Sequence, residues 1–287
     1  MKVIVAKSAG FCFGVRRAVE LVEQQTSERT LPVYTYGPII HNSEVVNELK
    51  EKGVRIIEGE DDIPEKGSGT VIIRSHGIKK EVYAALKESG FDVIDATCPF
   101  VLKIHQIVES ESEKGKRIVV AGDPKHPEVQ GIISFAGEDV TVIECPADAE
   151  NYENPDNREV CIVAQTTFNV TKFKDIVEIF DKKEYSVNVV NTICNATSAR
   201  QEEAKKLAEE ADCMIVIGDA HSSNSKKLFE ICSQLCVDTV FVQTLEDLVS
   251  RNDIFSKSTA CVGITAGAST PNKIIEEVQS YVRRYDI

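Results

Sequence analysis

The amino-acid sequence predicts an α/β protein built on parallel β-sheets. Short apolar segments typical of buried strands alternate with amphipathic helical segments along the whole chain. Polar residues gather directly after the apolar segments, as they do where parallel strands end and ligands bind. The length of 287 residues allows two or three domains rather than one.

The predicted strands follow one another at intervals that leave room for a helix between most of them. In chain order they are 3–6, 33–37, 70–75, 91–96, 117–122, 140–144, 159–165, 187–192, 213–219, 239–243 and 261–267. Between strands, apolar residues recur every three or four positions, which is typical of amphipathic helices. The clearest helical segments are 14–25, 43–53, 79–90 and 199–211.

Three cysteines stand at similar places in this alternation. VIDATC ends at Cys98 and VVNTIC ends at Cys194, and in both a buried strand leads to a cysteine before a helix-prone segment. SAGFCFGV, with Cys12 between two glycines, is a looser version of the same pattern. These thiols cut the chain into nearly equal parts, which predicts three similar α/β domains. The expected domains are 1–97, with the N-terminal strand and the Cys12 loop included, 98–193 and 194–287.

Composition and charge argue against several classes of function. A formal net charge of −13 without a basic stripe disfavours nucleic acid or an anionic membrane as a partner. The chain shows no signal-peptide pattern and no apolar run near the roughly 20 residues of a membrane span. Nine cysteines, odd in number and widely scattered, do not resemble the framework of a small secreted protein. We therefore expect a cytoplasmic protein that binds neither nucleic acid nor membrane.

Most of the cysteines have a plain interpretation as small buried residues. Those in strand patterns or on one helix face are Cys145, Cys161, Cys213, Cys232, Cys236 and Cys261. A C-x3-C pair occurs among them, but the further partners that a zinc site needs nearby are missing. Cys12, Cys98 and Cys194 differ because all three occupy strand-to-helix turns. We interpret them as metal ligands, and soft thiolates favour an iron-sulfur cluster, copper(I) or zinc.

Three histidines also follow predicted strands, namely His41 in PIIHNS, His76 in SHG and His126 in DPKHPEVQG. A surface or core role is the default for each, but their shared position favours one pocket. Glu128 lies two residues after His126. It is either a helix N-terminal carboxylate favoured by the helix dipole or a proton carrier with a raised pKa. His105, by contrast, looks helical and structural.

Hydroxyl and amide side chains follow three later strands. They are Thr166 and Thr167 in AQTT, Ser222, Ser223 and Asn224 in HSSNS, and Ser269 in AGAST. Such residues are common in turns and helix caps, yet at helix starts they also bind phosphate. No Walker A loop or G-x-G-x-x-G motif accompanies them, so a nucleotide has little support. The pattern favours a small phosphorylated or carboxylated ligand, and His221 beside it stays ambiguous.

The motifs of the chain, taken together, carry a family resemblance. In order they are GFCFGV with RRAVE, GPIIHN, RSHG, DATCP, HPEVQG, AQTT, NTICNAT followed by RQ, SSNS, and VGITAGAST. They closely resemble those of the 4-hydroxy-3-methylbut-2-enyl diphosphate reductases, the last enzymes of the non-mevalonate isoprenoid pathway. The resemblance spans nearly the whole chain.

This resemblance implies three α/β domains in a pseudo-threefold trefoil around a central 4Fe-4S cluster. It implies that Cys12, Cys98 and Cys194 hold the cluster and that the fourth iron binds the allylic hydroxyl of the substrate. Two electrons and two protons would then expel this hydroxyl as water. Isopentenyl and dimethylallyl diphosphate would both form, because the allyl intermediate can be protonated at either of two carbons.

The resemblance also assigns roles to single residues. Glu128 matches the proton-delivering acid, and Thr166 and Thr167 match the position that holds substrate and relays protons. The implied pocket histidines are His41, His76 and His126, the last of them beside the acid. The implied diphosphate binders are Ser222, Ser223, Asn224 and Ser269. Electrons would come from reduced ferredoxin or flavodoxin, since the chain shows no flavin or nicotinamide motif of its own.

Two other functions fit the residues without the resemblance. One is a zinc-dependent hydrolase of a small phosphate ester, with the three cysteines and a water on zinc. The other is a non-catalytic iron-sulfur redox sensor. Metal content and diphosphate-dependent oxidation of a reduced dye distinguish these two functions from the reductase.

Overall fold

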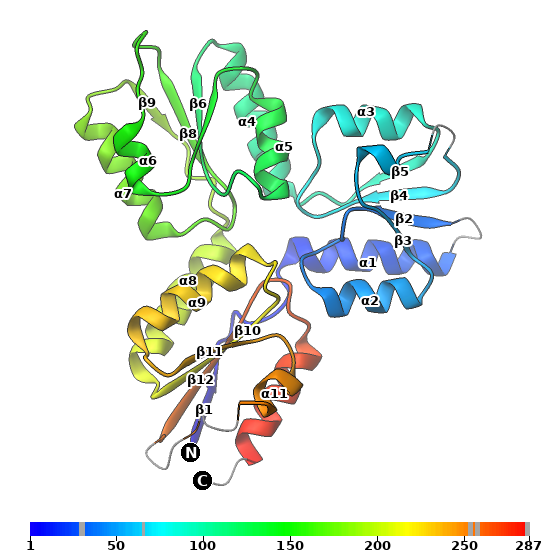
Figure 1. Ribbon diagram of the computed structural model, residues 1–287, viewed down its shortest axis with the longest axis vertical. Coiled ribbons are helices and arrows are strands. Elements are labelled where there is room, and N and C mark those ends of the chain that lie inside the picture. Colours follow the sequence, from blue (N-terminus) through cyan, green and yellow to red (C-terminus); the bar gives the residue numbers. More distant parts are fainter. Residues whose placement is uncertain (29–31, 65–66, 252–254, 256–258, 285–287) are drawn as a thin grey trace. The chain divides into compact units, whose positions relative to one another are not determined.

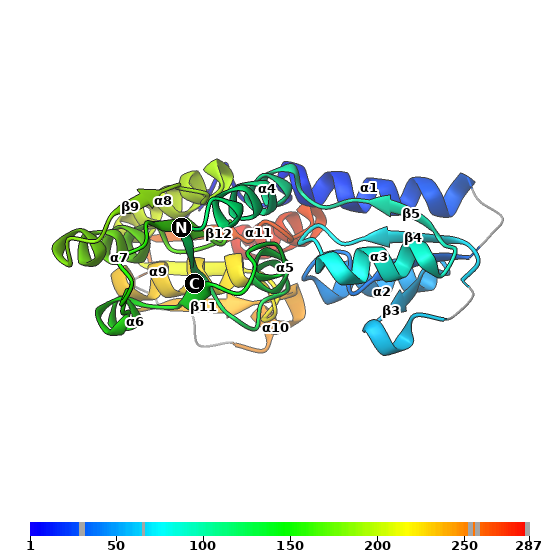
Figure 2. The same cartoon turned by 90° about the horizontal axis from the view of Figure 1, so that it is seen from above.

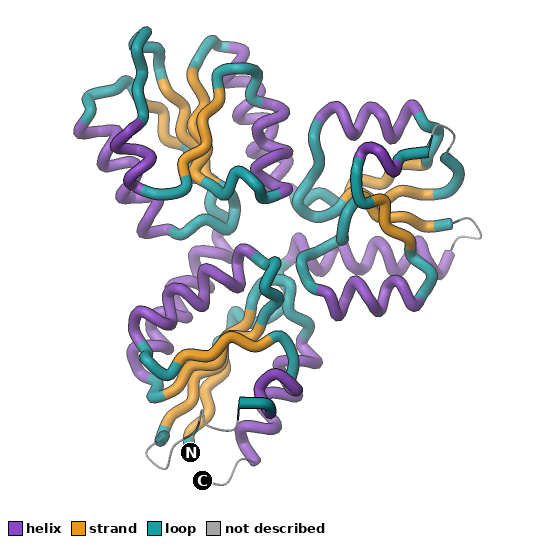
Figure 3. Tube along the Cα trace, in the orientation of Figure 1, coloured by secondary structure: helices purple, strands orange, loops and turns teal. Residues whose placement is uncertain are grey.

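The computed structural model describes residues 1–28, 32–64, 67–251, 255 and 259–284. These residues form three parallel four-stranded sheets, and each sheet has helices on both faces (Figures 1 and 3). The predicted α/β class is confirmed. By its internal contacts the chain divides into two units, which we describe separately. Unit 1 is 1–15, 41–45 and 195–287, and unit 2 is 16–40 and 46–194.

Unit 1 contains one sheet, in the strand order β1-β12-β10-β11. Its strands are β1 (Lys2–Val5), β10 (Cys213–Ile217), β11 (Thr239–Val242) and β12 (Cys261–Ala266). Helices α8 (Asn195–Glu210) and α9 (Ser223–Leu235) pack their apolar residues on one face of this sheet. Helices α10 (Leu245–Val249) and α11 (Asn272–Arg284) cover the other face.

Strand β1 differs from our expectation, which placed the N-terminal strand in a first domain of residues 1–97. It pairs in parallel with β12, with Val3 opposite Val262 and Val5 opposite Ile264. Figure 1 shows the two strands side by side. The valine side chains of β1 pack into the apolar cluster beneath α11, so burial of this strand depends on the C-terminal part of the chain. The proposed boundaries after residues 97 and 193 stay a prediction.

Unit 2 contains the other two sheets. The first, ordered β3-β2-β4-β5, consists of β2 (Val33–Tyr36), β3 (Arg55–Ile57), β4 (Thr70–Ile73) and β5 (Asp92–Asp95). Helices α1 (Phe13–Glu28), α2 (Ser43–Glu51) and α3 (Lys80–Glu88) accompany it, and a short 3-10 helix, η1 (Glu60–Asp62), follows β3. Arg17 of α1 donates hydrogen bonds to the carbonyls of Asp95 and Thr97, so α1 lies along β5 (Figure 2).

The second sheet of unit 2 has the strand order β7-β6-β8-β9. It consists of β6 (Arg117–Ala121), β7 (Val140–Ile143), β8 (Val160–Ala164) and β9 (Val187–Val189). Helices α4 (Pro99–Glu113) and α5 (Pro127–Phe135) cover one face, and α6 (Pro146–Asn151) and α7 (Val170–Lys182) cover the other. Both faces are therefore apolar, which explains the unbroken apolar runs of the inner strands.

The loops that follow the strands carry the polar residues singled out in the sequence. Every residue of β4, β8 and β10 is buried, and the first polar loop residues come directly after these strands. Because the strands of each sheet are parallel, their carboxyl ends share one edge, where helix N-termini also lie. Among the described residues, no helix has the length and apolar character needed to cross a membrane.

Candidate active site

In unit 2, Glu128 lies in the first turn of α5 and is 1% exposed. The backbone N–H of Thr166 donates to its Oε1 at 2.6 Å, and the Thr166 hydroxyl donates to its Oε2 at 2.8 Å. Burial raises the pKa of Glu128 to about 7, and the two bonds from Thr166 offset only part of this effect. Glu128 can therefore carry a proton near neutral pH, which is one of the two interpretations that the sequence left open.

Thr166 connects this carboxyl group to one of the three selected cysteines. Its carbonyl accepts a hydrogen bond from the backbone N–H of Cys194 at 3.0 Å. Thr166 itself is buried in the turn after β8, and Thr167 follows it as a half-buried residue. One residue thus bonds both to the candidate acid and to a candidate metal ligand.

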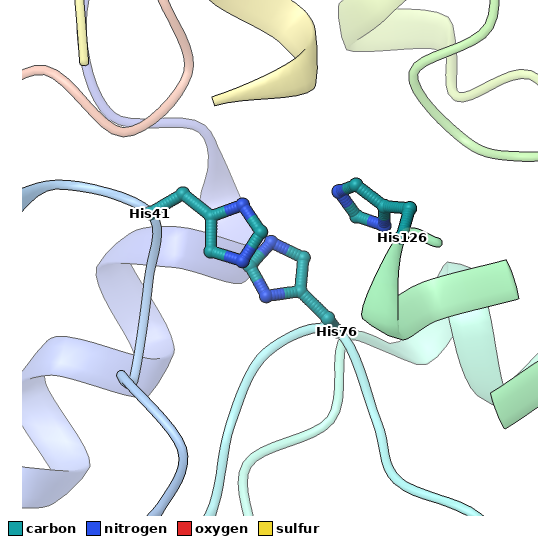
Figure 4. Close-up of side chains that lie close together, drawn as sticks. All are labelled: His41, His76 and His126. Carbon is teal, nitrogen blue, oxygen red and sulfur yellow. The ribbon is translucent and has the colours of Figure 1, made fainter. Parts of the chain in front are cut away.

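His126 and His76 lie near this acid. His126 is buried and caps α5, because its Nδ1 accepts a hydrogen bond from the backbone N–H of Glu128 at 3.1 Å. A ring nitrogen that accepts carries no proton, so the proton of the neutral ring is on Nε2. The rings of His76 and His126 meet edge to face, with centroids 5.4 Å apart and planes at 85° (Figure 4).

Cys98 is held by the loop that carries His76. Cys98 is the N-cap residue of α4, and its backbone N–H donates to the Ser75 carbonyl at 2.9 Å. The Ser75 hydroxyl and N–H both donate to the Ile39 carbonyl, which ties two loops together. In the same loop Gly77 has φ +74, and a Cβ there would lie 3.0 Å from the ring of His105.

His105 has the structural role predicted for it. It is 5% exposed on α4, and its ring stacks on Phe135 with centroids 4.4 Å apart. Burial lowers the pKa of His105 to about 4, against the opposing effect of the Asp95 charge. His105 is therefore neutral and packed under the loop of Gly77.

In unit 1, the start of α9 forms a cradle at the ends of β10 and β12. Ser225 is fully buried there, and a Cβ on Gly218 or on Gly267 would clash with its hydroxyl, at 2.2 and 2.0 Å. The lack of these two methyl groups lets the helix start approach the strand ends closely. Ser222 caps the helix, accepting from the Ser225 N–H at 3.3 Å and from its hydroxyl at 2.9 Å.

Asn224 lies in the first turn of α9 and is 3% exposed. Its Oδ1 accepts a hydrogen bond from the backbone N–H of Ala268 at 3.0 Å. Its Nδ2 has no hydrogen-bond partner among the described residues, although it is buried. An unsatisfied buried amide donor is costly, and an anionic ligand at the helix start would satisfy it. The half-buried Ser223 precedes it as the first helical residue.

His41 lies in unit 1 beside the same loops. The Ser269 hydroxyl donates to the His41 carbonyl at 2.9 Å, so Ser269 anchors the histidine's backbone. The His41 ring places Nδ1 2.8 Å from the His221 carbonyl. Because a carbonyl only accepts, Nδ1 carries the proton and Nε2 is the acceptor nitrogen of the neutral ring.

Asp219 is a residue that the sequence analysis missed. It is 2% exposed, and its Oδ2 accepts from the N–H of Ser43, close to His41 in the chain, at 2.9 Å. Its Oδ1 accepts from the His221 N–H at 2.7 Å and lies 2.9 Å from His221 Nδ1. Although burial alone would raise it, the hydrogen bonds from His221 and Ser43 hold the pKa of Asp219 below its ordinary value. Asp219 thereby fixes the segment that carries His41 and the segment whose carbonyl accepts from the His41 ring.

The cysteines differ in burial. Cys12 and Cys194 directly precede α1 and α8, as Cys98 precedes α4, and all three are half-buried. Four others are buried, and burial raises their pKa. The pKa is about 11 for Cys161 and about 12 for Cys213 and Cys232, and burial also raises the pKa of Cys236. Cys145 and Cys261 are half-buried, one beside α6 and one at the start of β12.

The structure thus gathers the predicted residues into two groups. Unit 2 contains Glu128, His126, His76, Thr166, Thr167, Cys98 and Cys194, and unit 1 contains Cys12, His41, Ser222, Ser223, Asn224 and Ser269. The donor set fits an iron-sulfur cluster, because these three cysteines are half-buried at helix starts, a position that Cys145 shares, whereas four of the other six are buried in the core. That the three converge on one centre stays a prediction.

Parallel α/β sheets that carry a buried acid, a histidine that caps a helix and helix-start donors at their carboxyl ends define an enzyme of the α/β class. Comparison with known proteins identifies the family. The chain belongs to the LytB protein family, which matches residues 3–283.

Curated relatives in this family are similar over their full length. A protein of a Nitratiruptor species is 43% identical, with 100% of both chains covered. One of Clostridioides difficile (strain 630) is 42% identical and covers 98% of this chain and 99% of its own. Both are named 4-hydroxy-3-methylbut-2-enyl diphosphate reductase.

Solved structures agree with these relatives. The E-1-hydroxy-2-methyl-but-2-enyl-4-diphosphate reductase from Plasmodium falciparum matches with a TM-score of 0.90 at 30% identity, covering 98% of this chain and 87% of that one. An (E)-4-hydroxy-3-methyl-but-2-enyl diphosphate reductase, described as the terminal enzyme of the non-mevalonate pathway, matches with a TM-score of 0.68 at 44% identity. It covers 99% of this chain and 100% of that one.

Proposed function

We propose that this chain is a 4-hydroxy-3-methylbut-2-enyl diphosphate reductase. The reaction removes the allylic hydroxyl group of its substrate as water, consumes two electrons and two protons, and yields isopentenyl or dimethylallyl diphosphate. The observation that carries the proposal is the buried Glu128 carboxyl, with a pKa of about 7 and bonded to the residue that also binds Cys194. Reductive removal of a hydroxyl group as water requires a proton donor, and Glu128 can supply the proton.

The cofactor that we propose is one 4Fe-4S cluster held by Cys12, Cys98 and Cys194. When bound, it would supply the electrons and an open iron that acts as a Lewis acid toward the hydroxyl oxygen. Reduced ferredoxin or flavodoxin would deliver the electrons, and a cytoplasmic location suits such donors. The assignment of the three cluster ligands is supported by the thiol positions at three helix starts.

The side chains have separate tasks in this reaction. Glu128 delivers a proton, and Thr166 orients its carboxyl group through two hydrogen bonds. Nε2–H of His126 is a donor for the substrate, because its Nδ1 is occupied by the helix cap. Thr167 follows Thr166 in the chain, and His76 makes an edge-to-face contact with His126.

The diphosphate would bind at the start of α9 in unit 1. The Asn224 Nδ2 group supplies a donor that is otherwise unsatisfied, and the helix N-terminus adds N–H groups and a favourable dipole. Ser222 and Ser223 flank this donor, and Ser269 and His41 complete the site that we propose.

The test is anaerobic purification followed by iron and sulfide analysis and by a reduced-viologen assay with the hydroxylated C5 diphosphate. We expect about four irons and four sulfides per chain and diphosphate-dependent dye oxidation. Cys98→Ser should lose cluster and activity together, whereas Cys261→Ser should keep both. Zinc without sulfide would instead identify a hydrolase, and a cluster without turnover would identify a sensor.

A further inference from the structure

The loop before Cys12 is held by two side chains of α8. Arg200 is 3% exposed, and its guanidinium donates through Nε to the Ser8 carbonyl at 3.0 Å. Its Nη2 donates to the Gly10 carbonyl at 2.7 Å and also to that of Ser8. Glu203, one turn further along α8, accepts from the Lys7 N–H at 2.8 Å and the Ser8 N–H at 2.9 Å. We call Arg200 and Glu203 the α8 clamp.

The charges of the α8 clamp match the polarity of the loop backbone. Carbonyl oxygens point toward the cation and N–H groups toward the anion, so each side chain makes charge-assisted hydrogen bonds. Although burial alone would raise it, the bonds from Ser8 and Lys7 hold the pKa of Glu203 below its ordinary value. Through these bonds both clamp residues act on the backbone that precedes Cys12 rather than on the thiol.

The loop before Cys12 has a backbone conformation that it would lose without these restraints. Gly10 has φ +99, a conformation that L side chains rarely adopt, and a Cβ there would lie 2.6 Å from Asn272 Oδ1. Past this point the Cys12 N–H donates to the Ala268 carbonyl at 3.2 Å. The segment is therefore fixed at two places, by α8 before Gly10 and by the loop after β12 at Cys12. The α8 clamp supplies most of the hydrogen bonds at the first of these places.

We infer that Arg200 and Glu203 are positioning residues that set the direction in which the Cys12 thiol is presented. The inference deepens the proposed function, since presentation of Cys12 as a ligand rests on the proposed cluster. Loosening the clamp should free the loop locally while the sheet of unit 1, which neither residue pairs with, stays folded.

The test compares Arg200→Lys and Glu203→Gln with wild type and with Glu202→Gln in the full-length protein. Lysine keeps the charge but loses the forked geometry, and glutamine keeps the size but loses the anion. Glu202 is the matched control, since it neighbours Glu203 on α8 but is exposed and pairs with Lys206 at 2.7 Å. One measurement is the rate of cluster loss to an iron chelator, followed by visible absorbance. The other is site-resolved alkylation of the cluster-free protein, followed by mass spectrometry.

In both clamp variants we expect Cys12 alkylation and cluster loss to accelerate about tenfold, with Glu202→Gln at the wild-type rates. Cys232, fully buried in the core of the same unit, reports general unfolding and should keep its wild-type rate. Equal acceleration at Cys12 and Cys232 would overturn the inference, as would unchanged Cys12 rates. If Arg200→Lys does not fold, Glu203→Gln decides alone. A wild-type protein that binds no cluster would refute the proposed function, while the thiol rates would still test the clamp.

Discussion

Replacing Glu128 with glutamine should remove the proposed acid and, at alkaline pH, stabilise the protein. Glutamine has nearly the same size as glutamate and can still accept one of the two hydrogen bonds from Thr166. It cannot ionise, so it avoids the cost of a negative charge in a site that is 1% exposed. Turnover and stability should therefore change in opposite directions, which is common for functional residues.

The magnitude follows from the pKa of Glu128, which burial raises from 4.5 to about 7. One pKa unit corresponds to about 1.4 kcal/mol, so ionised Glu128 costs the folded state about 3 kcal/mol. A raised pKa means that the folded state holds the proton more tightly than the unfolded state. Its contribution to stability is complete below pH 4.5 and is lost as pH rises through about 7. Between about pH 5 and pH 8.5, the free energy of unfolding should shift by roughly 2.5 kcal/mol in favour of Glu128→Gln.

The assay is urea unfolding followed by far-UV circular dichroism at the two pH values. Glu138→Gln is the control, because Glu138 is exposed and lies just after the same helix. If the difference between Glu128→Gln and wild type does not change with pH, the carboxyl group ionises normally and the argument from burial is wrong. In the dye-oxidation assay, wild-type turnover should fall about tenfold per pH unit above pH 7, since only the protonated acid acts.

Three further predictions concern neighbouring groups. Thr166→Val removes a hydroxyl that stabilises ionised Glu128, so the alkaline limb of the pH-rate profile should move up by about one pH unit. Asn224→Ala removes the unsatisfied donor, so KM for the diphosphate should rise about tenfold or more, with a smaller change in kcat. Asp219→Asn weakens the hydrogen bonds that the side chain accepts from the Ser43 and His221 N–H groups. A ¹⁵N NMR spectrum should then show the His41 ring in both tautomers rather than one.

Each of these predictions has an outcome that contradicts it. An unchanged pH profile in Thr166→Val would mean that the hydroxyl does not bond to the charged carboxylate. Asn224→Asp keeps the acceptor for Ala268 but adds a charge that repels phosphate. If it restored the wild-type KM, Asn224 would have only a structural role. A single His41 tautomer in Asp219→Asn would show that the His221 carbonyl keeps its position without the Asp219 carboxylate.

The sequence predicted most of the strands because these depend on local patterns, while the choice of site residues stays a prediction. Apolar runs identified the strands, and the turns that follow them contain the selected cysteines and histidines. Strand β3, at Arg55–Ile57, was missed because three residues with an exposed arginine show no strand pattern. A raised pKa of Glu128 is one of the two interpretations that its place after His126 left open, and burial of the carboxyl group favours it.

Features that depend on distant pairing could not be predicted. The N-terminal strand was assigned to the first domain because periodicity identifies a strand but not its neighbour in the sheet. Asp219 in GDAHSS has the composition of an ordinary turn, and its partner Ser43 is 176 positions away. In the sequence, Arg200 has the appearance of an exposed helix residue. The structure shows that it donates to the carbonyls of Ser8 and Gly10, which are 192 and 190 positions away.

The pairing of β1 with β12 also has a consequence for synthesis of the protein. The ribosome makes β1 before the strand beside it and the helix beneath it, which follow only at Cys261–Ala266 and Asn272–Arg284. Until then the valines of β1 have no apolar cluster against which to pack. Pairing β1 with β12 also closes a long loop of chain, which is slow. The Cys12 loop acquires its shape only when Arg200, Glu203 and Ala268 have been made. A cofactor that needs Cys12 can therefore be inserted only after these segments have been made, and until then the nascent chain leaves this thiol without the contacts that hold its loop.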